Sequence, residues 1–177
     1  AVTWNLFGSL PPVNSLVELR ESSSFKPLPD IILLGTQEAN ELSAYLSAAK
    51  PKLNGKEAIK VFNQHLVVAC HTMGGIHSAV LVKRQLKDNF EVDRKEKMKA
   101  GFCNMLGNKG AISIEATLMG QQLQFKIATL LPIKSKPGEK PNIGRILDEL
   151  VHKDLHTDII FLGDFNYRLD MEEKEYK

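Results

Sequence analysis

The stretch Phe161–Asp170, which reads FLGDFNYRLD, decides how the rest of the chain is interpreted. The apolar run 159–162 is typical of a buried strand, and it ends at Gly163. Asp164 can accept a proton or hold a metal, and Asn166 can donate a hydrogen bond. If the strand stays extended to residue 166, both side chains project to the same side. The stretch therefore fits the floor of an active site, and equally a buried strand that leaves through an Asx/Gly turn.

Two further residues of this stretch have the chemistry to bind an anion. Tyr167 supplies a phenolic hydroxyl, and Arg168 supplies a planar guanidinium that suits phosphate and carboxylate groups. In the structural alternative, Arg168 and Asp170 are solvated residues of a turn. The rest of the chain must decide between these interpretations.

Length and composition indicate a soluble globular domain. The chain has 177 residues, of which 43% are hydrophobic and 25% charged, and this is enough to bury a core. A formal net charge of +2 does not by itself indicate nucleic-acid binding. We see no secretory signal and no apolar run of membrane-spanning length. Both ends fall in strand-like or charged sequence, so we expect a fragment of a larger protein.

The cysteines and histidines give little support to a zinc site. Cys70 and Cys103 are far apart in sequence, which favours reduced thiols in a cytosolic protein, although a single bridge is compatible with them. His65, His71 and His77 lie near Cys70, but their spacing matches no standard zinc pattern. We expect ordinary strand histidines.

Hydrophobic periodicity predicts alternating strands and helices with an antiparallel block in the middle. This order is typical of a mixed sheet layered with helices. The predicted strands cover residues 2–6, 30–35, 59–70, 76–82, 112–119, 121–131 and 159–166, with an edge strand and loop in 83–99, and the predicted helices cover 42–49 and 143–151.

Polar groups recur where the predicted strands end. Asn5 follows the first strand and could face a metal, although an Asn before a turn is common. Glu38 follows the second strand and could bind a hard cation, although a carboxylate near a helix N-terminus is also common. Asn108 and Lys109 lie within the tetrapeptide Gly107–Gly110, where backbone and two donors could approach a phosphate. The same tetrapeptide is an ordinary hairpin turn.

These groups together predict metal-assisted phosphoester hydrolysis. An amide and a carboxylate suit Mg²⁺, a hard cation that keeps waters and binds phosphates, and lysine and arginine suit the phosphate itself. Asp164 would polarise or deprotonate a water for in-line attack, and Asn166 would support the charge that develops on phosphorus.

Several segments, in this order, resemble the signatures of the inositol polyphosphate 5-phosphatases. They are TWNLFGSLPP at Thr3–Pro12, GTQE at Gly35–Glu38, KAGFCNMLGNKGA at Lys99–Ala111 and FLGDFNYRLD at Phe161–Asp170. GDFNYR with an upstream LGNKG is specific for that family within the exonuclease III/DNase-I-like superfamily. The pattern is most similar to the SH2-domain-containing inositol phosphatases, and the resemblance runs over almost the full chain.

The resemblance implies a DNase-I-like α/β fold, a four-layer sandwich with mixed sheets, incomplete in a single partial catalytic domain over residues 1–177. It implies Mg²⁺-dependent removal of the 5-phosphate from phosphoinositides, such as phosphatidylinositol 3,4,5-trisphosphate, or from soluble inositol phosphates. It also implies a cytoplasmic signalling enzyme that is recruited to the inner membrane surface and has no nucleic-acid partner.

The motif match also implies a role for each site residue. Glu38 would be the metal ligand with Asn5 beside it, Asp164 would activate the water, and Asn166 would stabilise the transition state. The residues of the implied phosphate-binding surface are Asn108, Lys109, Tyr167 and Arg168, with Lys99 as a further contributor.

Two departures from the family pattern lower the activity that we expect. Thr129 stands where the family carries a phosphate-contacting histidine, and a hydroxyl can donate a hydrogen bond but carries no charge. The family's C-terminal W-C-D-R and S-D-H motifs, the latter with the catalytic histidine, do not occur in these 177 residues. We therefore expect weaker phosphate binding and little or no phosphatase activity.

Two other functions are compatible with the same residues. A Mg²⁺-dependent endonuclease of this superfamily would also use Asn5, Glu38 and a Gly-Asp-x-Asn element, but a near-neutral chain suits a compact polyanion better than a duplex. A non-catalytic relative that binds phosphoinositide or a protein partner would be consistent with Thr129.

Overall fold

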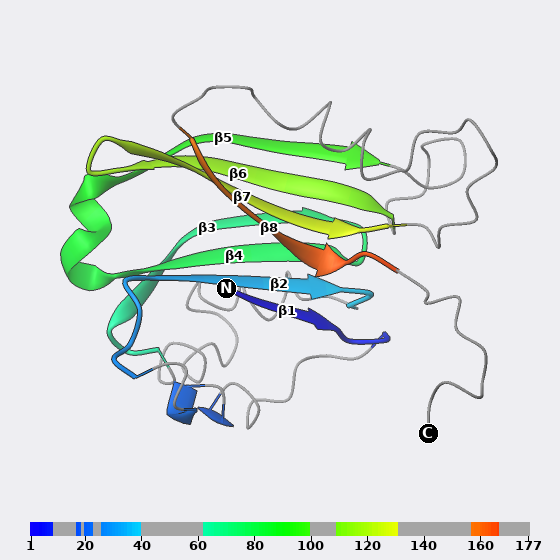
Figure 1. Ribbon diagram of the computed structural model, residues 1–177, viewed down its shortest axis with the longest axis horizontal. Coiled ribbons are helices and arrows are strands. Elements are labelled where there is room, and N and C mark those ends of the chain that lie inside the picture. The colour runs from blue at the N-terminus through cyan, green and yellow to red at the C-terminus, as the bar shows by residue number, and fades with distance from the viewer. Residues whose placement is uncertain are drawn as a thin grey trace, which may run out of the picture.

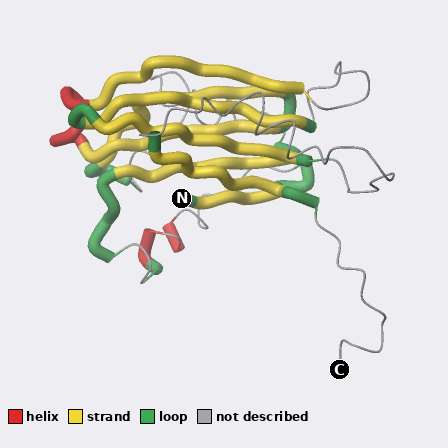
Figure 2. The backbone as a smooth tube through the Cα atoms, turned by 45° about the horizontal axis from the view of Figure 1, so that its top comes forward, coloured by secondary structure: helices red, strands yellow, loops and turns green. Residues whose placement is uncertain are grey.

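Two four-stranded sheets face each other in the computed structural model, which describes residues 1–8, 17–18, 20–22, 26–39, 62–99, 109–130 and 157–166 (Figures 1 and 2). Sheet A has the strand order β1-β2-β4-β3, and sheet B has the order β5-β6-β7-β8. The elements are β1 Val2–Asn5, β2 Ile31–Gln37, β3 His65–Met73, β4 Ile76–Lys83, the 3₁₀ helix η2 Arg84–Asn89, β5 Phe90–Lys99, β6 Gly110–Leu118, β7 Gln121–Thr129 and β8 Asp158–Asp164.

Each sheet is mixed, as the sequence predicts. The pairs β1–β2 and β7–β8 are parallel, and the remaining pairs are antiparallel. The arrowheads of β1, β2, β7 and β8 lie on the same side of the molecule in Figure 1. The residues that follow these strands therefore meet at one end of the sandwich.

An apolar core fills the space between the sheets. Leu33 and Val80 of sheet A pack in one cluster with Ile114, Phe125 and Ile127 of sheet B, and all five are buried. Strand alternation supplies these side chains, because every second residue of a strand points to the same face. Burial of several such side chains, each worth about 1.5–3 kcal/mol, holds the two sheets together.

The two sheets approach each other closely at Gly35 of β2. A Cβ atom at this position would lie 2.5 Å from Cδ1 of Ile127 in the opposite sheet. The absent side chain leaves room for the isoleucine, so the two sheets meet closely beside Glu38. The sequence pattern alone identifies Gly35 only as the last residue of an apolar run.

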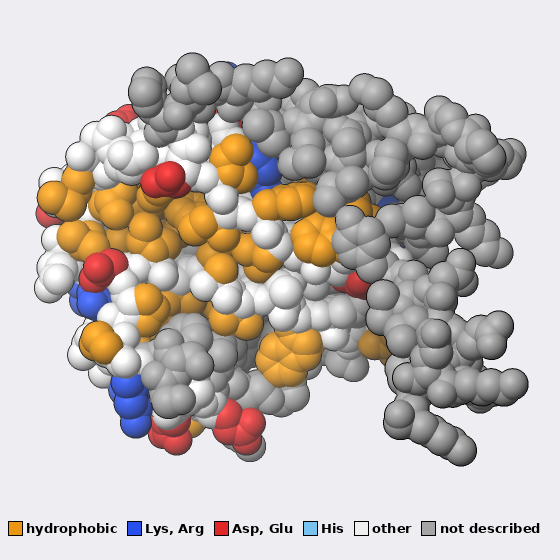
Figure 3. All heavy atoms as spheres, viewed as in Figure 1, with side chains coloured by type: hydrophobic (Ala, Val, Ile, Leu, Met, Phe, Trp, Pro, Cys, Tyr) orange, Lys and Arg blue, Asp and Glu red, His pale blue; other side chains and the backbone are white. Residues whose placement is uncertain are grey.

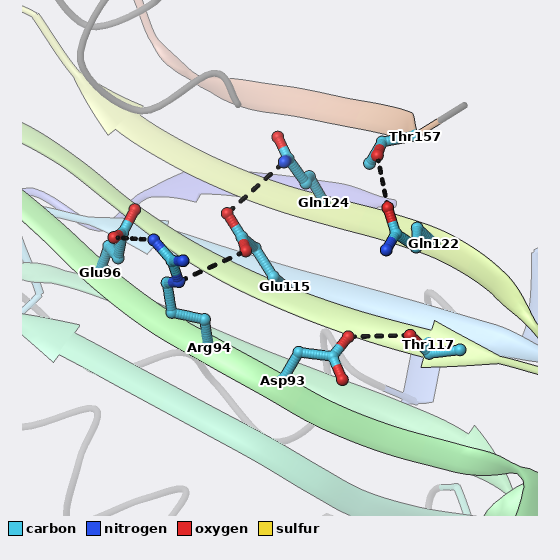
Figure 4. A network of polar contacts seen from close by, with 8 residues as sticks. All are labelled: Asp93, Arg94, Glu96, Glu115, Thr117, Gln122, Gln124 and Thr157. Carbon is cyan, nitrogen blue, oxygen red and sulfur yellow. Dashed lines mark hydrogen bonds and ion pairs between the residues drawn. The ribbon is translucent and has the colours of Figure 1, made fainter. Parts of the chain in front are cut away.

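A polar network covers part of the outer face of sheet B (Figure 4). Arg94 donates to Glu96 at 2.9 Å and lies 3.7 Å from a carboxylate oxygen of Glu115, which also accepts from Gln124 at 3.5 Å. Lys126 is buried beside this network, and burial lowers the pKa of its ammonium while Glu115 and Glu96 act in the opposite direction. These contacts join β5, β6 and β7 away from the strand ends, so they belong to the scaffold.

The open edge of the sandwich is apolar. β1 and β8 are the strands at this edge of the two sheets, and Ile159 and Ile160 of β8 are 41% and 39% exposed. Figure 3 shows hydrophobic side chains gathered on the face that carries these edge strands. Contiguous exposed apolar surface generally marks a place where further chain or a partner packs.

The predicted strands are largely confirmed, but the boundaries of β3 and β8 differ from the prediction, and β8 is an edge strand with no buried residue rather than a buried strand. Residues 62–64 form a turn rather than a strand, closed by the 2.8 Å hydrogen bond from the His65 amide to the Phe62 carbonyl. The turn lets the buried Phe62 ring pack on the outer face of sheet A. The predicted helices 42–49 and 143–151 lie outside the described residues. In the part of the chain that is described, no helix has the length and apolarity needed to cross a membrane.

The buried histidine of β4 predicts a stability that depends on pH. Burial lowers the pKa of His77 below its ordinary 6.5, and the hydrogen bond from Nε2 to the Ala39 carbonyl opposes this only in part. The unfolded chain therefore binds the proton more readily, so stability is complete above pH 6.5 and falls as the pH drops through 6.5 toward the folded pKa. Urea unfolding at pH 7.5 and pH 5 should show a smaller loss in His77→Gln than in the wild type. An equal loss in both proteins would contradict this.

Candidate active site

One row of paired residues crosses sheet B at the end where the parallel strands finish. Lys99 pairs with Gly110, Gly110 with Thr129, and Thr129 with Asp164. Residues paired directly across strands share one face of the sheet. The row therefore presents Lys99, Thr129 and Asp164 on one face, and Lys109 precedes Gly110 at the start of β6.

A hydrogen bond joins this row to the end of β1 in sheet A. Asn5 donates from Nδ2 to Oδ2 of Asp164 at 2.9 Å, and its Oδ1 accepts from the Phe7 amide at 3.0 Å. Asn5 and Asp164 are 159 residues apart in sequence. The bond shows that the row faces sheet A, and it fixes the Asn5 amide with its oxygen toward its own turn.

An ion pair forms a second bridge between the sheets. The Lys109 ammonium donates to Oε1 of Glu38 at 3.1 Å, with the two side chains 16% and 34% exposed. Glu38 directly follows β2, whose last residue, Gln37, is paired with Asn5 of β1. Asn5, Glu38, Lys109 and Asp164 thus lie at one end of the sandwich.

The backbone holds Glu38 in an unusual conformation. Its φ is +52°, in the left-handed region that costs a non-glycine residue about 1–2 kcal/mol. The Gly8 amide donates to the Glu38 carbonyl at 2.6 Å, and the Ala39 amide donates to the Gly75 carbonyl at 3.1 Å. These bonds fix the direction of the side chain, and backbone strain of this kind clusters at functional sites.

Asn166 differs from its predicted placement. The strand β8 ends at Asp164, and Asn166 has a φ of +50°, so alternation along an extended strand does not place it. Its backbone amide donates to Oδ1 of Asp164 at 3.0 Å, and its side-chain amide donates to the Leu130 carbonyl at 2.8 Å. An Asx-type turn after Asp164 competes with extension, and asparagine tolerates the left-handed region. The turn helps to fix the carboxylate.

Thr129 carries a buried hydroxyl at the centre of the row. The residue is fully buried, and its Oγ1 has no hydrogen-bond partner among the described residues. A buried polar group without a partner costs about 1–3 kcal/mol, so its position beside Asp164 suits a ligand oxygen. This hydroxyl occupies the position of the histidine expected from the family pattern.

Removal of the Thr129 hydroxyl should have opposite effects on the stability of the fold and on its affinity for phosphate. We expect Thr129→Val to raise the free energy of unfolding by about 1 kcal/mol and to weaken phosphate binding, because an orphan donor is lost. Urea unfolding and titration with inorganic phosphate measure the two effects. Ser113→Ala is the matched control, since Ser113 is another buried hydroxyl without a partner among the described residues, on the opposite face of sheet B. A less stable Thr129→Val with unchanged phosphate affinity would contradict the expectation.

The donor set fits a magnesium ion that keeps most of its waters. Within the described residues no group of three His, Cys, Asp or Glu side chains could cage a metal. Glu38 already holds a cationic group, the Lys109 ammonium, and Asn5 lies at the neighbouring strand end, where one lone pair of its amide oxygen accepts from the Phe7 amide. Mg²⁺ is commonly held by one or two carboxylates together with substrate phosphates. Glu38 and Asn5 are therefore compatible with the predicted ligand role.

Several predicted site residues fall outside the described part of the chain. They are Asn108, Tyr167 and Arg168, and Cys103 is also outside it. Lys99 is exposed at the end of β5, in the row that leads to Asp164. The structure thus joins Asn5, Asp164 and Asn166 by hydrogen bonds and Glu38 with Lys109 by an ion pair, and it places Lys99 in the same end row.

Two of the described histidines bond to backbone carbonyls of the scaffold. His65 bonds the Pro29 carbonyl at 2.7 Å, His77 bonds the Ala39 carbonyl at 3.3 Å, and Cys70 is a free thiol. Among the described residues, the groups that donate to the Asp164 carboxylate are the Asn5 side chain and the Asn166 amide, neither of them a histidine.

Sequence reasoning missed a pair that supports the site. Thr3 of β1 and Gln37 of β2 exchange hydrogen bonds at 3.1 and 2.8 Å, and Gln37 is buried. The pair locks the two strands just before Asn5 and Glu38. The sequence signal that could have found this pair is Gln37 itself, a polar residue at an inward-facing position of an apolar strand.

Comparison with known proteins defines the class. The model of Endonuclease/Exonuclease/phosphatase family 2 matches residues 2–177, so the chain belongs to this family. It is 26% identical over 200 residues to human phosphatidylinositol 3,4,5-trisphosphate 5-phosphatase 1 and 29% identical over 195 residues to human phosphatidylinositol 3,4,5-trisphosphate 5-phosphatase 2. These matches cover 96% and 98% of the chain but only 16% and 15% of the relatives. The resemblance to 5-phosphatases is confirmed, and the chain spans about a sixth of those relatives.

Solved structures confirm the DNase-I-like α/β sandwich. The inositol polyphosphate 5-phosphatase domain of a synaptojanin, in complex with inositol (1,4)-bisphosphate and calcium ion, matches with a TM-score of 0.67 and 20% identity. The match covers 98% of this chain and 54% of that one. A Cimex nitrophorin matches with a TM-score of 0.70 and 13% identity, over 98% of this chain and 61% of that one. TDP2 of D. rerio, complexed with single-strand DNA product, matches at 0.54 with 18% identity, over 94% and 60%. The shared fold does not by itself decide the function.

Proposed function

We propose that this chain is the metal- and phosphate-binding part of a Mg²⁺-dependent phosphoinositide 5-phosphatase domain. The observation that carries the proposal is the pair of bridges Asn5–Asp164 and Glu38–Lys109, which bring all four signature segments to one end of the sandwich. The similar relatives are named as 5-phosphatases of phosphatidylinositol 3,4,5-trisphosphate. The chain forms one partial catalytic domain, consistent with its 54% coverage of the synaptojanin chain.

The proposed chemistry assigns one task to each group. Glu38 and Asn5 hold the magnesium ion, which supplies positive charge to the phosphate oxygens. Asp164 orients the attacking water, and the donors Asn5 and the Asn166 amide keep its carboxylate in one direction. Lys109, Lys99 and the Thr129 hydroxyl bind phosphate, together with Asn108, Tyr167 and Arg168 from outside the described residues. Asn166 supports the charge that develops in the transition state.

We propose that this chain binds its substrate better than it hydrolyses it. Asp164 has no histidine donor within the described residues, and Thr129 offers a neutral hydroxyl at the position of a charged contact. A paired general acid or base typically contributes 10²–10⁴-fold in rate, so turnover should be slow. The substrate is a phosphoinositide head group, which the enzyme reaches from the cytoplasmic surface of a membrane, or a soluble inositol phosphate.

Phosphate release from inositol 1,4,5-trisphosphate tests the proposal, with MgCl₂ or EDTA and with the protein in excess. We expect slow, metal-dependent release of phosphate, together with measurable binding of the inositol phosphate. Nicking of plasmid DNA without phosphate release would favour the endonuclease alternative instead. Ligand binding with no release at all, unchanged by Asp164→Ala, would favour a non-catalytic relative.

A further inference from the structure

The carboxylate assigned to the metal already has a cation. Lys109 lies 3.1 Å from Oε1 of Glu38, and the lysine is the more buried of the two side chains, at 16% exposure against 34%. The ammonium occupies one oxygen of this carboxylate, and a divalent cation at Glu38 would draw on the same negative charge. The two cations therefore compete, and entry of a metal weakens the ion pair.

Lys109 is the partner that can move. The backbone of Glu38 is held by hydrogen bonds on both of its sides, so the direction of its Cα–Cβ bond is fixed at a φ of +52°. Lysine carries its ammonium on a flexible four-carbon stem with rotatable donors. A competing cation therefore displaces the ammonium rather than the carboxylate.

A candidate position for a phosphate lies in the neighbouring row of sheet B. Lys109 precedes Gly110, and Gly110 pairs with Thr129 in the row that ends at Asp164. The Thr129 hydroxyl is buried there without a partner among the described residues. A phosphate that accepts from this hydroxyl would lie within the same strand-end cluster as Lys109.

We propose that Lys109 is an exchangeable cation that couples metal binding to phosphate binding. It neutralises Glu38 while no metal is present, and it turns to a phosphate group once a divalent cation takes its place. This inference rests on the proposed function, because it uses the same Glu38 site. Linkage then requires reciprocity: the metal raises the affinity for phosphate, and phosphate raises the affinity for the metal by the same factor.

The plain alternative is a structural ion pair that joins the sheets. Such a pair would make Lys109→Met less stable and would leave metal binding unchanged or weaker. The exchange proposal predicts instead that Lys109→Met binds the metal more tightly than the wild type. The sign of the change in Mg²⁺ affinity therefore separates the two.

The test is calorimetric titration of the 177-residue chain with MgCl₂ in the absence of phosphate. We expect Lys109→Met to bind Mg²⁺ about three- to tenfold more tightly, because a competing charge is gone. Lys109→Arg keeps the charge and should stay within about twofold of the wild type. Lys87→Met, the same change at an exposed residue of η2, should leave the affinity unchanged.

A second titration, with inorganic phosphate, measures the coupling. Saturating MgCl₂ should raise the phosphate affinity of the wild type by at least about fivefold, and the gain should be at least about threefold smaller in Lys109→Met. Unchanged or weaker Mg²⁺ binding by Lys109→Met, while Glu38→Gln loses Mg²⁺ binding, would overturn the exchange and leave the proposed function standing. Unchanged Mg²⁺ affinity in Glu38→Gln would overturn both.

Discussion

Gly163→Ala is expected to lower the free energy of unfolding by at least about 3 kcal/mol. The φ of Gly163 is +148°, a conformation that L side chains rarely adopt. A Cβ atom there would also lie 1.9 Å from the carbonyl oxygen of Ala128, which belongs to the backbone of β7 and cannot turn aside. The strand must therefore move away from β7, and Asp164 would move with it.

Gly120→Ala is the matched control for this change. Gly120 also has a positive φ, of +84°, but, apart from its own chain neighbours, no atom of the described residues lies within 4 Å of the position of its Cβ. Its substitution should cost only about 1 kcal/mol, because it lacks the overlap with a neighbouring strand. Urea unfolding followed by circular dichroism measures both variants. Equal losses in the two would show that the approach of β8 to β7 is not as close as described.

Asp164→Ala is expected to lower the rate of phosphate release by at least about a hundredfold, while inositol trisphosphate still binds. The side chain carries the carboxylate that orients the water, and no other described carboxylate bonds to Asn5 or the Asn166 amide. Binding should persist because the predicted phosphate contacts come from other residues. Single-turnover hydrolysis with protein in excess measures the rate even where turnover is slow.

Asp158→Ala is the control on the same strand. Asp158 begins β8 at the other end of the strand, where it accepts from Gln121 at 3.4 Å on the exposed surface. Its removal should change neither release nor binding. An Asp164→Ala protein that is folded and releases phosphate as fast as the wild type would contradict the role given to this carboxylate.

Much of the fold could be predicted from patterns that are local in sequence. The continuous apolar run of β2, the hairpin around Gly74 and the hairpin around Gly120 are each visible within about ten residues. The residues of the site could be nominated for the same reason, since polar groups that follow apolar strands stand out. Residues 62–64 were misread because β-branched residues flank them on both sides, which makes 59–70 look like one continuous strand.

The contacts within the site could not be predicted, because they join segments far apart in sequence. Asn5 and Asp164 are separated by 159 residues, and Glu38 and Lys109 by 71. No spacing rule states that the lysine of a glycine-flanked loop will bind the carboxylate expected to hold the metal. The left-handed turn at Asn166 also depends on the Leu130 carbonyl of a neighbouring strand.

The comparison with solved structures shows why the function must rest on these residues. A nitrophorin, a TDP2 and a synaptojanin phosphatase domain share the sandwich with this chain at 13–20% identity. The scaffold that joins β1, β2, β7 and β8 is therefore compatible with more than one activity. The residues at the strand ends must therefore distinguish one activity from another.

Titration of the chain with inositol 1,4,5-trisphosphate, in MgCl₂ and in EDTA, tests the strand-end site most directly. We expect binding in MgCl₂ that weakens by at least about tenfold in EDTA and equally in Glu38→Gln, because Glu38 and the metal act together. Glu91→Gln, the same change at an exposed residue of β5, should bind as the wild type does. Binding that is equally tight in MgCl₂, in EDTA and in Glu38→Gln, or no binding by the folded chain, would contradict a metal-dependent phosphate site at these strand ends.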